Sequence, residues 1–455
     1  MVSSVTGRKY LEGSRAPVTE ELTTYDLPVT GQIPEELEGR WLRNGPNPYG
    51  NVDPNSYHWF LGDGMIHGVR LRGGKAEWYR NRWVRGKDLA ERLGEEPPSG
   101  ECFRNSGFSP NTSVIGHSGH TLALVEAGIS PVSLTYELET IGYTNFEGTL
   151  PGAFTAHTKF DPVTEELHGV CYTYPDIPDR VQHVVVGMDN RVKKVTDVPL
   201  DGMPMIHDMS LTETYALIYD LPVCVDIEMA MSGKRFPFAW NDDHQPRVGL
   251  LPRNGTAEDI IWCEAPSCYV FHPVNAFDVQ TNDGTNQVVV DLCRFDRMFY
   301  SDLHGPFESI PKLARWTIDP TTGTVSEDIV SEQSQDFPTH DPRVVARKYQ
   351  YAYTSWLDLG HTCRTDMETG EIVHHDHGEG RFGAEPLFIP RADGKNEEDG
   401  WVMVVVNDEN NGPAELVILD ANDMAKEPVA RIHLPQRVPD GFHGSWVPDS
   451  VVPPK

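Results

Sequence analysis

Short apolar segments alternate with turn sequences along most of the chain. From about residue 41 onward, runs of about five to eight residues rich in Val, Ile and Leu recur between residues that favour turns. Such runs are typical of β-strands. Clear examples are MIHGVRL (65–71), HTLALVEA (120–127), QVVVDLC (287–293), WVMVVVN (401–407) and AELVILD (414–420). The pattern therefore predicts an all-β protein.

The turns between these runs share one chemistry. Segments 161–164 (DPVT), 319–323 (DPTTG) and 367–370 (METG) each separate two apolar runs. Asp and Pro favour the start of a type I turn, and Gly accepts the left-handed conformation that closes it. Recurrent hairpins of this kind favour a radial array of small sheets. The repeats are too divergent to give a period, so the pattern alone also allows a sandwich or a double barrel.

The whole chain, 1–455, is expected to form a single domain. Its 40 Gly and 36 Pro are spread along the sequence, and no linker divides it. Residues 1–40 are interpreted as a polar N-terminal arm. The segment 221–240 (LPVCVDIEMAMSGKRFPFAW) is the candidate helical insertion, because IEMAM contains no helix-breaking residue.

Charge and cysteine content restrict the class of protein. The formal net charge is −30, which makes nucleic-acid binding improbable because the phosphate backbone is also anionic. The first residues lack the apolar run of a signal peptide, and no window approaches 18 apolar residues. The 7 cysteines are scattered and form no CxxC pair. We therefore expect a reduced, cytoplasmic protein.

Four of the 18 histidines lie in apolar or small-residue surroundings. They are His157 in FTAH, His207 in MIHD, His272 in FHPVN and His443 in GFHG. A buried imidazole requires a partner, and one shared metal ion would serve all four. Their wide spacing excludes a zinc-finger clip and suits a site built where several sheets converge. The cluster HHDHGEG (374–380) is interpreted instead as an exposed loop, because Asp, Gly and Glu surround it.

An all-imidazole set would leave a divalent metal with its full charge. Imidazole suits Fe, Cu, Zn and Ni alike, and four ligands leave two positions open on an octahedral ion. Ligating imidazoles usually donate their other N–H to a carboxylate. The candidate carboxylates, each within or beside an apolar run, are Glu126, Asp336 and Glu385.

Several segments together resemble one known family. They are GRWLRNGPNP (39–48), HWFLGDGMIH (58–67), AHTKFDPVTEELHG (156–169), MIHDMSLT (205–212), FHPVNAFD (271–278), EPLFIPR (385–391) and GFHGSW (441–446). In this order they resemble the carotenoid cleavage oxygenases, a family that includes carotenoid, apocarotenoid and stilbene cleavers. The resemblance implies a seven-bladed β-propeller with a helical or loop cap over one face, and residues 221–240 are the candidate for that cap.

The resemblance also implies an axial Fe(II) ion. The family's four ligand positions fall on His157, His207, His272 and His443, and its three orienting carboxylates fall on Glu126, Asp336 and Glu385. The family typically has Glu before Phe-Pro where this chain has Asp336, so we expect the shorter side chain to reach its imidazole through a water or a backbone shift. Thr112 matches a threonine that crowds an open iron position. His58 and His67 match positions that are not ligands and are interpreted as structural.

The implied reaction is oxidative cleavage of a carbon–carbon double bond with O2, giving two carbonyl products. Stilbene-cleaving relatives typically carry Lys directly before the first orienting Glu, whereas this chain has Val125, so an apolar carotenoid or apocarotenoid is favoured. The expected substrate-contacting residues are Phe60, Phe108, Val125, Phe154 and Phe271. No proton-transfer residue is expected. A monomer or homodimer in transient contact with membranes would suit such a substrate.

Four other functions remain open from the sequence. A stilbene-cleaving dioxygenase or a double-bond isomerase would use the same metal site. A zinc hydrolase would use the same imidazoles without O2. A non-enzymatic propeller that only binds a ligand would not require converging histidines at all.

Overall fold

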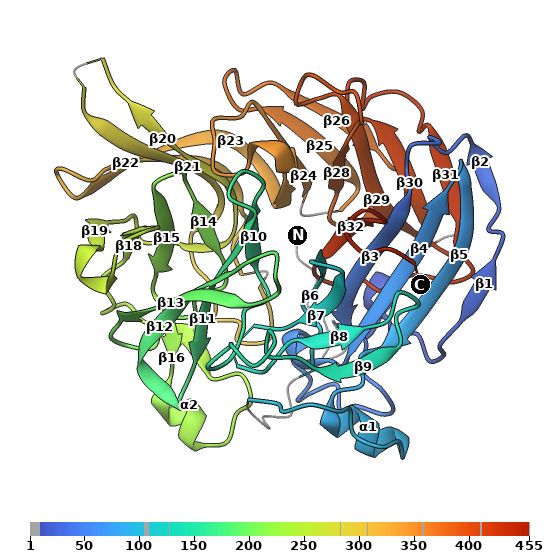
Figure 1. The fold of residues 1–455 in the computed structure, drawn as a ribbon, viewed down its shortest axis with the longest axis horizontal. Coiled ribbons are helices and arrows are strands. Elements are labelled where there is room, and N and C mark those ends of the chain that lie inside the picture. The colour runs from blue at the N-terminus through green and yellow to red at the C-terminus, as the bar shows by residue number, and fades with distance from the viewer. Residues whose placement is uncertain are drawn as a thin grey trace.

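The protein forms a ring of small antiparallel sheets around a central axis (Figure 1). The computed structural model describes residues 10–103, 109–126, 128–282, 284–306, 308–356, 359–409 and 412–454. The apolar runs expected to be strands lie in β4, β7, β21, β29 and β30, whose bounds are given below. The prediction of an all-β protein is therefore confirmed.

The first four sheets, or blades, follow one another around the ring. Blade 1 contains β32 (Gly444–Pro448), β3 (Gly39–Pro46), β4 (Gly64–Arg72), β5 (Lys75–Trp83) and β1 (Thr23–Tyr25). Blade 2 contains β6 (Ser113–His117), β7 (His120–Leu124), β8 (Val132–Leu134) and β9 (Thr140–Tyr143). Blade 3 contains β10 (Thr158–Asp161), β11 (Glu166–Thr173), β12 (Ile177–Val186) and β13 (Val192–Pro199). Blade 4 contains β14 (Met209–Leu211), β15 (Tyr215–Asp220), β18 (Arg247–Pro252) and β19 (Ile261–Glu264).

Three further blades complete the ring. Blade 5 contains β20 (Tyr269–Gln280), β21 (Asn286–Phe295), β22 (Lys312–Asp319) and the first part of β23 (Thr324–Thr339). Blade 6 contains the last part of β23 with β24 (Tyr351–Trp356), β25 (His361–Asp366) and β26 (Ile372–Asp376). Blade 7 contains β27 (Arg381–Gly383), β28 (Leu387–Pro390), β29 (Gly400–Asp408), β30 (Glu415–Asp420), β31 (Ala430–His433) and β2 (Val29–Gly31). The seven-bladed β-propeller is therefore confirmed.

Both ends of the chain close the ring. β32, near the C-terminus, pairs with β3 in blade 1, with Gly444 opposite Arg43. The N-terminal segment supplies β1 to blade 1 and β2 to blade 7, so residues 23–31 join the sheets and do not form a free arm. In Figure 1 the blue and red strands accordingly lie side by side. Pairing within the ring removes sheet edges that would otherwise be open.

The predicted turns form hairpins as their residues require. The Asp161 carboxylate accepts the backbone N–H of Val163 at 2.9 Å, and Asp319 accepts that of Thr321 at 2.8 Å. Gly323 adopts φ +70° at the end of its turn. These turns connect β10 to β11 and β22 to β23. The Asp-Pro signal therefore identified real hairpins.

Burial explains which strands are continuously apolar. β29 lies inside blade 7 between two strands and is buried along nearly its whole length, which matches its sequence WVMVVV. The first part of β23 alternates exposed and half-buried positions, which matches its polar sequence. The largest hydrophobic cluster spans blades 3, 4 and 5 and includes Trp316 and Tyr269. Packing between blades therefore forms the core around the axis.

The segment predicted as a helical insertion is mostly a hairpin. β16 (Val223–Val225) pairs with β17 (Phe238–Trp240), and α2 (Ile227–Met231) lies between them. In the described residues, α1 (Lys87–Leu93) is the other α-helix, so a helical cap is not found there. Four 3-10 turns are Gly13–Arg15, Trp59–Leu61, Ala257–Asp259 and Pro342–Val344. None of the helices described is both long and apolar enough to cross a membrane.

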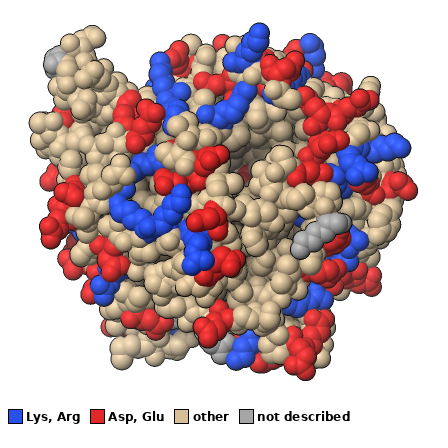
Figure 2. Space-filling model, in the orientation of Figure 1, with Lys and Arg blue, Asp and Glu red and all other residues tan. Residues whose placement is uncertain are grey.

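Charged side chains are distributed over the face shown in Figure 2. Acidic and basic groups are interspersed there and do not form a single basic surface. Many are paired within or between blades, as for Arg315 with Asp291 at 2.7 Å. Such a face offers no continuous footprint for an anionic polymer.

Candidate metal centre

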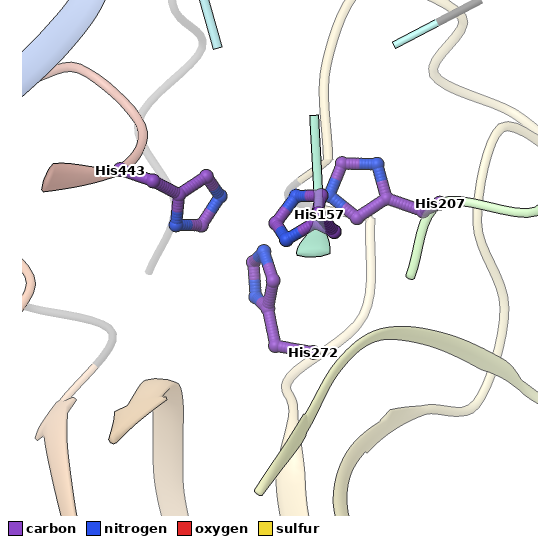
Figure 3. A group of neighbouring side chains, drawn as sticks. All are labelled: His157, His207, His272 and His443. Carbon is purple, nitrogen blue, oxygen red and sulfur yellow. The ribbon is translucent and has the colours of Figure 1, made fainter. Parts of the chain in front are cut away.

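Four histidines from four blades converge on one point (Figure 3). His157 and His443 directly precede β10 and β32, His207 lies two residues before β14, and His272 lies near the start of β20. One ligand atom from each lies within 4.8 Å of the corresponding atom of every other. The four residues proposed from separate motifs are therefore brought together by the fold.

Burial favours the neutral form of two of these imidazoles, His157 and His443. The pKa of His157 and that of His443 lie well below the usual value, first because of burial and then because of the neighbouring imidazoles. Nε2 of His157 and Nε2 of His272 are buried and have no hydrogen-bond partner among the described residues. A neutral imidazole with a free lone pair is a metal ligand, and burying it without a partner is costly. The donor set therefore fits a transition-metal ion.

Three of the four imidazoles contact a carboxylate through Nδ1. Glu126 hydrogen-bonds His207, Asp336 lies 2.7 Å from His272, and Glu385 lies 2.7 Å from His443. An ionised carboxylate only accepts hydrogen bonds, so Nδ1 donates and Nε2 keeps its lone pair for the centre. The carboxylates come from blades 2, 6 and 7. Each of the seven blades thus contributes one residue to the histidines or their carboxylate partners.

Asp336 reaches its histidine directly. A register shift between β23 and β24 follows Asp336, and the next residue, Phe337, has φ +53°. The Phe337 ring stacks on His272 with centroids 5.2 Å apart. A β-bulge re-aims neighbouring side chains, which compensates for the shorter side chain. The expectation of a bridging water is therefore wrong, and the alternative of a local backbone adjustment agrees with the geometry.

Glu385 is a carboxylate of the centre that is strongly affected by burial. Burial raises the pKa of the Glu385 carboxyl to about 7, against the lowering effect of Arg43 and of the Gly444 N–H. That N–H donates to Oε2 at 2.8 Å. Burial also lowers the pKa of Arg43, which lines the same cavity. The positive charge of Arg43 favours the ionised form of Glu385 and so opposes the effect of burial on that carboxyl.

Glu126 has a partner that the sequence did not indicate. The hydroxyl of Tyr172 donates to Oε1 of Glu126, while Oε2 contacts His207. Burial and then Glu126 raise the pKa of Tyr172 far above its usual value, so the hydroxyl keeps its proton. Tyr172 lies within the apolar strand β11, where a tyrosine gives no signal of a site.

A cavity of about 540 Å³ lies against the histidines. Phe60, Val125 and Phe271, which were expected to contact substrate, line it, and so does Thr112. Thr112 is tied to the centre because its carbonyl accepts the N–H of His443 at 3.0 Å. The cavity walls also include Phe236 and Phe238 from the inserted hairpin, Phe295, and Phe442. The histidines therefore face a predominantly apolar space.

One of the expected wall residues, Phe154, is not found there. Phe154 does not line the cavity; it is buried in the core with its ring 4.8 Å from that of Phe146, so its predicted substrate contact is wrong. Phe108 lies outside the described residues. His58 stacks on Phe236 at 4.2 Å, and His67 hydrogen-bonds Tyr79 at 2.7 Å, which agrees with structural roles for both histidines.

The fold and the axial histidines define a propeller with a four-histidine group that could hold a metal ion. The family model described as "Retinal pigment epithelial membrane protein" matches residues 15–448. A carotenoid cleavage oxygenase of Mycobacterium tuberculosis is 40% identical, covering 96% of this chain and 97% of that protein. A carotenoid 9,10(9',10')-cleavage dioxygenase of Crocus sativus is 32% identical, covering 96% of this chain and 89% of that protein.

A solved structure agrees with this relationship. The lignostilbene dioxygenase of Pseudomonas brassicacearum superposes with a TM-score of 0.87 at 27% identity, covering 97% of this chain and 98% of that one. The chain belongs to the carotenoid cleavage oxygenase family, and it is an oxidoreductase of that family.

Proposed function

We propose that this protein is a non-heme Fe(II) oxygenase that uses O2 to cleave a carbon–carbon double bond of a carotenoid or apocarotenoid. The observation that supports this most directly is the convergence of four imidazoles, three of them hydrogen-bonded to carboxylates, on one side of an apolar cavity. Family membership supports the reaction class, and the geometry supports the assignment of these residues.

The four histidines would hold the iron, and the carboxylates of Glu126, Asp336 and Glu385 would fix three of their rings. Bound iron would supply the ability to activate O2 at an open position. Imidazoles bring no charge, so the ion keeps its 2+ charge in a buried place. Thr112 lines the cavity next to His443 and would restrict access to an open position.

The remaining residues would position the alkene and exclude water. Phe60 and Phe271 stand with rings 6.2 Å apart at 86°, and both contact Phe299. Such aromatic walls bind an extended apolar chain and keep one double bond near the histidines. A dry cavity also limits side reactions with water.

The residue beside Glu126 favours a polyene over a phenol. Val125 lines the cavity and offers no hydrogen bond, and the nearby Tyr172 hydroxyl already donates to Glu126. A phenolic hydroxyl buried against Val125 would gain no hydrogen bond from that side chain, and an unpaired buried hydroxyl is costly. The polyene needs only apolar walls.

Cleavage of a stilbene is the second candidate. The similarity to a lignostilbene dioxygenase over nearly the whole chain supports it. In this chain the cavity also includes Lys234 and Arg235 of the inserted hairpin, which could receive a polar end of a substrate. Only the products can distinguish the two candidates.

The decisive experiment compares metals, substrates and oxygen in one series. The purified protein would be stripped with a chelator, loaded anaerobically with Fe(II) or Zn(II), and given carotenoids, apocarotenoids and hydroxystilbenes under 18O2. We expect aldehyde or ketone products carrying 18O only with Fe(II) and an apolar polyene. Product formed without O2 would exclude an oxygenase, and cleavage of stilbenes alone would establish the second candidate.

A further inference from the structure

His157 is the one axial histidine without a carboxylate of its own. The Nδ1 atoms of His272 and His443 lie 2.7 Å from their carboxylates, and His207 is also in direct contact with Glu126. Nδ1 of His157 lies 3.5 Å from Oδ2 of Asp208, which is a longer and weaker contact.

That Asp208 oxygen is shared with a lysine. Nζ of Lys159 lies 2.8 Å from Oδ2, and Oδ1 accepts the backbone N–H of Met209 at 2.6 Å. The side chain of Asp208 is 3% exposed and that of Lys159 is 22% exposed. Because the carboxylate is buried, the ammonium compensates most of its charge. Oδ1 of Asp208 is thus held by the backbone N–H of Met209, and Oδ2 lies between Nζ of Lys159 and Nδ1 of His157.

The two charged residues connect two ligand segments. Asp208 directly follows His207 at the start of β14, and Lys159 lies two residues after His157, in β10. Each segment therefore carries one axial histidine and one charged residue, and the two charged residues, Lys159 and Asp208, pair with each other. His157 also lies close to every other axial ring, with centroids 4.3 Å from His207, 5.5 Å from His272 and 4.4 Å from His443. Its orientation consequently bears on the whole group.

We infer that Asp208 and Lys159 are positioning residues for His157, with Asp208 orienting the ring and Lys159 limiting how much negative charge the ring receives. This inference rests on the proposed function, because it requires a metal at the histidines. It makes His157 a weaker donor than the three histidines whose Nδ1 atoms hydrogen-bond a carboxylate directly.

The two members of the pair have different expected effects. Asp208→Asn removes the charge that orients His157, so metal affinity should fall by about 10- to 100-fold. Lys159→Met leaves Asp208 held by Met209 and gives its full charge to His157. The ligand field should then change, while the affinity changes by less than about fivefold, as for other partly exposed ion pairs.

Co(II) is a suitable probe because its visible absorption reports the ligand field. The stripped full-length protein would be titrated with Co(II), and the spectrum, the dissociation constant in competition with a chelator, and the melting temperature of the metal-free form would be measured. Asp161→Asn is the matched control. Asp161 pairs with Arg253 at 2.7 Å between the same two blades, and its hydrogen bonds and ion pairs are to Val163, Arg253 and Arg347 and not to an axial histidine.

We expect Asp208→Asn to weaken Co(II) binding, Lys159→Met to shift the absorption bands, and Asp161→Asn to lower the melting temperature alone. Asp208→Glu should restore part of the affinity. If Asp208→Asn lowers the melting temperature like the control but binds Co(II) normally, the pair only ties the blades together and the inference is wrong. If the unmodified protein binds neither Co(II) nor Fe(II), the proposed function fails and the inference fails with it.

Discussion

Two groups of histidines in this propeller contrast sharply. The axial group, His157, His207, His272 and His443, is dispersed in sequence and converges in space. The peripheral group of blade 6, His361, His374, His375 and His377, is nearly contiguous in sequence on β25 and β26 and just beyond. Its members do not form a further group of converging ligand atoms in the residues that the structure describes.

The geometry of a strand explains why the peripheral group does not converge. Successive side chains on β26 point to opposite faces, so His374 is exposed while His375 is buried. His377 is also buried, and its Nε2 lies 2.9 Å from the Thr362 hydroxyl. The interpretation of this cluster as an exposed loop is therefore wrong for His375 and His377. Proximity in sequence does not make a metal site, whereas convergence at an axis with carboxylates behind the rings does.

The largest predicted effect tests the axial group itself. His207→Ala should abolish activity and lose most of the bound iron, because it removes both a ligand and the partner of Glu126. His375→Ala, which deletes an equally buried histidine of the peripheral group, should keep one iron per chain. Metal analysis and product formation would be measured on both. A His207→Ala protein that turned over normally would exclude the ligand assignment.

A smaller effect is predicted for the groups behind the rings. Asp336→Ala should weaken iron binding by about 10- to 100-fold, because His272 loses the acceptor that fixes its ring and tautomer. Thr362→Ala removes the corresponding partner of His377 and should leave iron affinity unchanged. Competition with a chelator gives both affinities. Equal losses in the two variants would show that the effect is general destabilisation.

The contrast also shows what the sequence could reveal. Apolar runs and Asp-Pro turns predicted the strands and hairpins because these depend on local chemistry. The four histidines and three carboxylates were accessible through their motifs. The Asp336 contact depends on a bulge and a positive φ at Phe337, and the role of Tyr172 depends on which face of β11 meets Glu126. Such features arise from packing between blades, which no local pattern records.

The next effect concerns stability at low pH. Burial lowers the pKa of His377 to about 3, from 6.5 for an exposed imidazole. At pH values between these two, His377 therefore binds a proton in the unfolded chain but not in the folded chain. The stability that depends on neutral His377 is fully present above pH 6.5 and is lost as the pH falls. From pH 7 to pH 5 the expected loss from His377 is about 2 kcal/mol.

Urea unfolding of the metal-free protein at both pH values would measure this loss, since no metal can then be released by acid. His377→Gln should show a smaller decrease in stability between pH 7 and pH 5 than the unmodified protein. His374→Gln is the control, because His374 is exposed on β26, three residues before His377. An identical decrease in all three proteins would mean that His377 does not remain neutral in the folded state.

The smallest effect on the metal is predicted for Val125→Lys. Val125 lines the cavity, whereas the carboxylate of Glu126 is held by His207 and Tyr172, so the new side chain should leave those two contacts intact. Iron affinity should stay within about threefold of the original value, below the 10-fold expected for the loss of an orienting carboxylate.

Polyene cleavage by Val125→Lys should fall, because an ammonium group in an apolar cavity is costly. Val125→Met separates charge from size, since it adds a long apolar side chain. If Val125→Lys lost the metal while Val125→Met kept it, the added charge would be acting on Glu126. The claim that residue 125 belongs to the cavity wall and does not affect the metal centre would then be wrong.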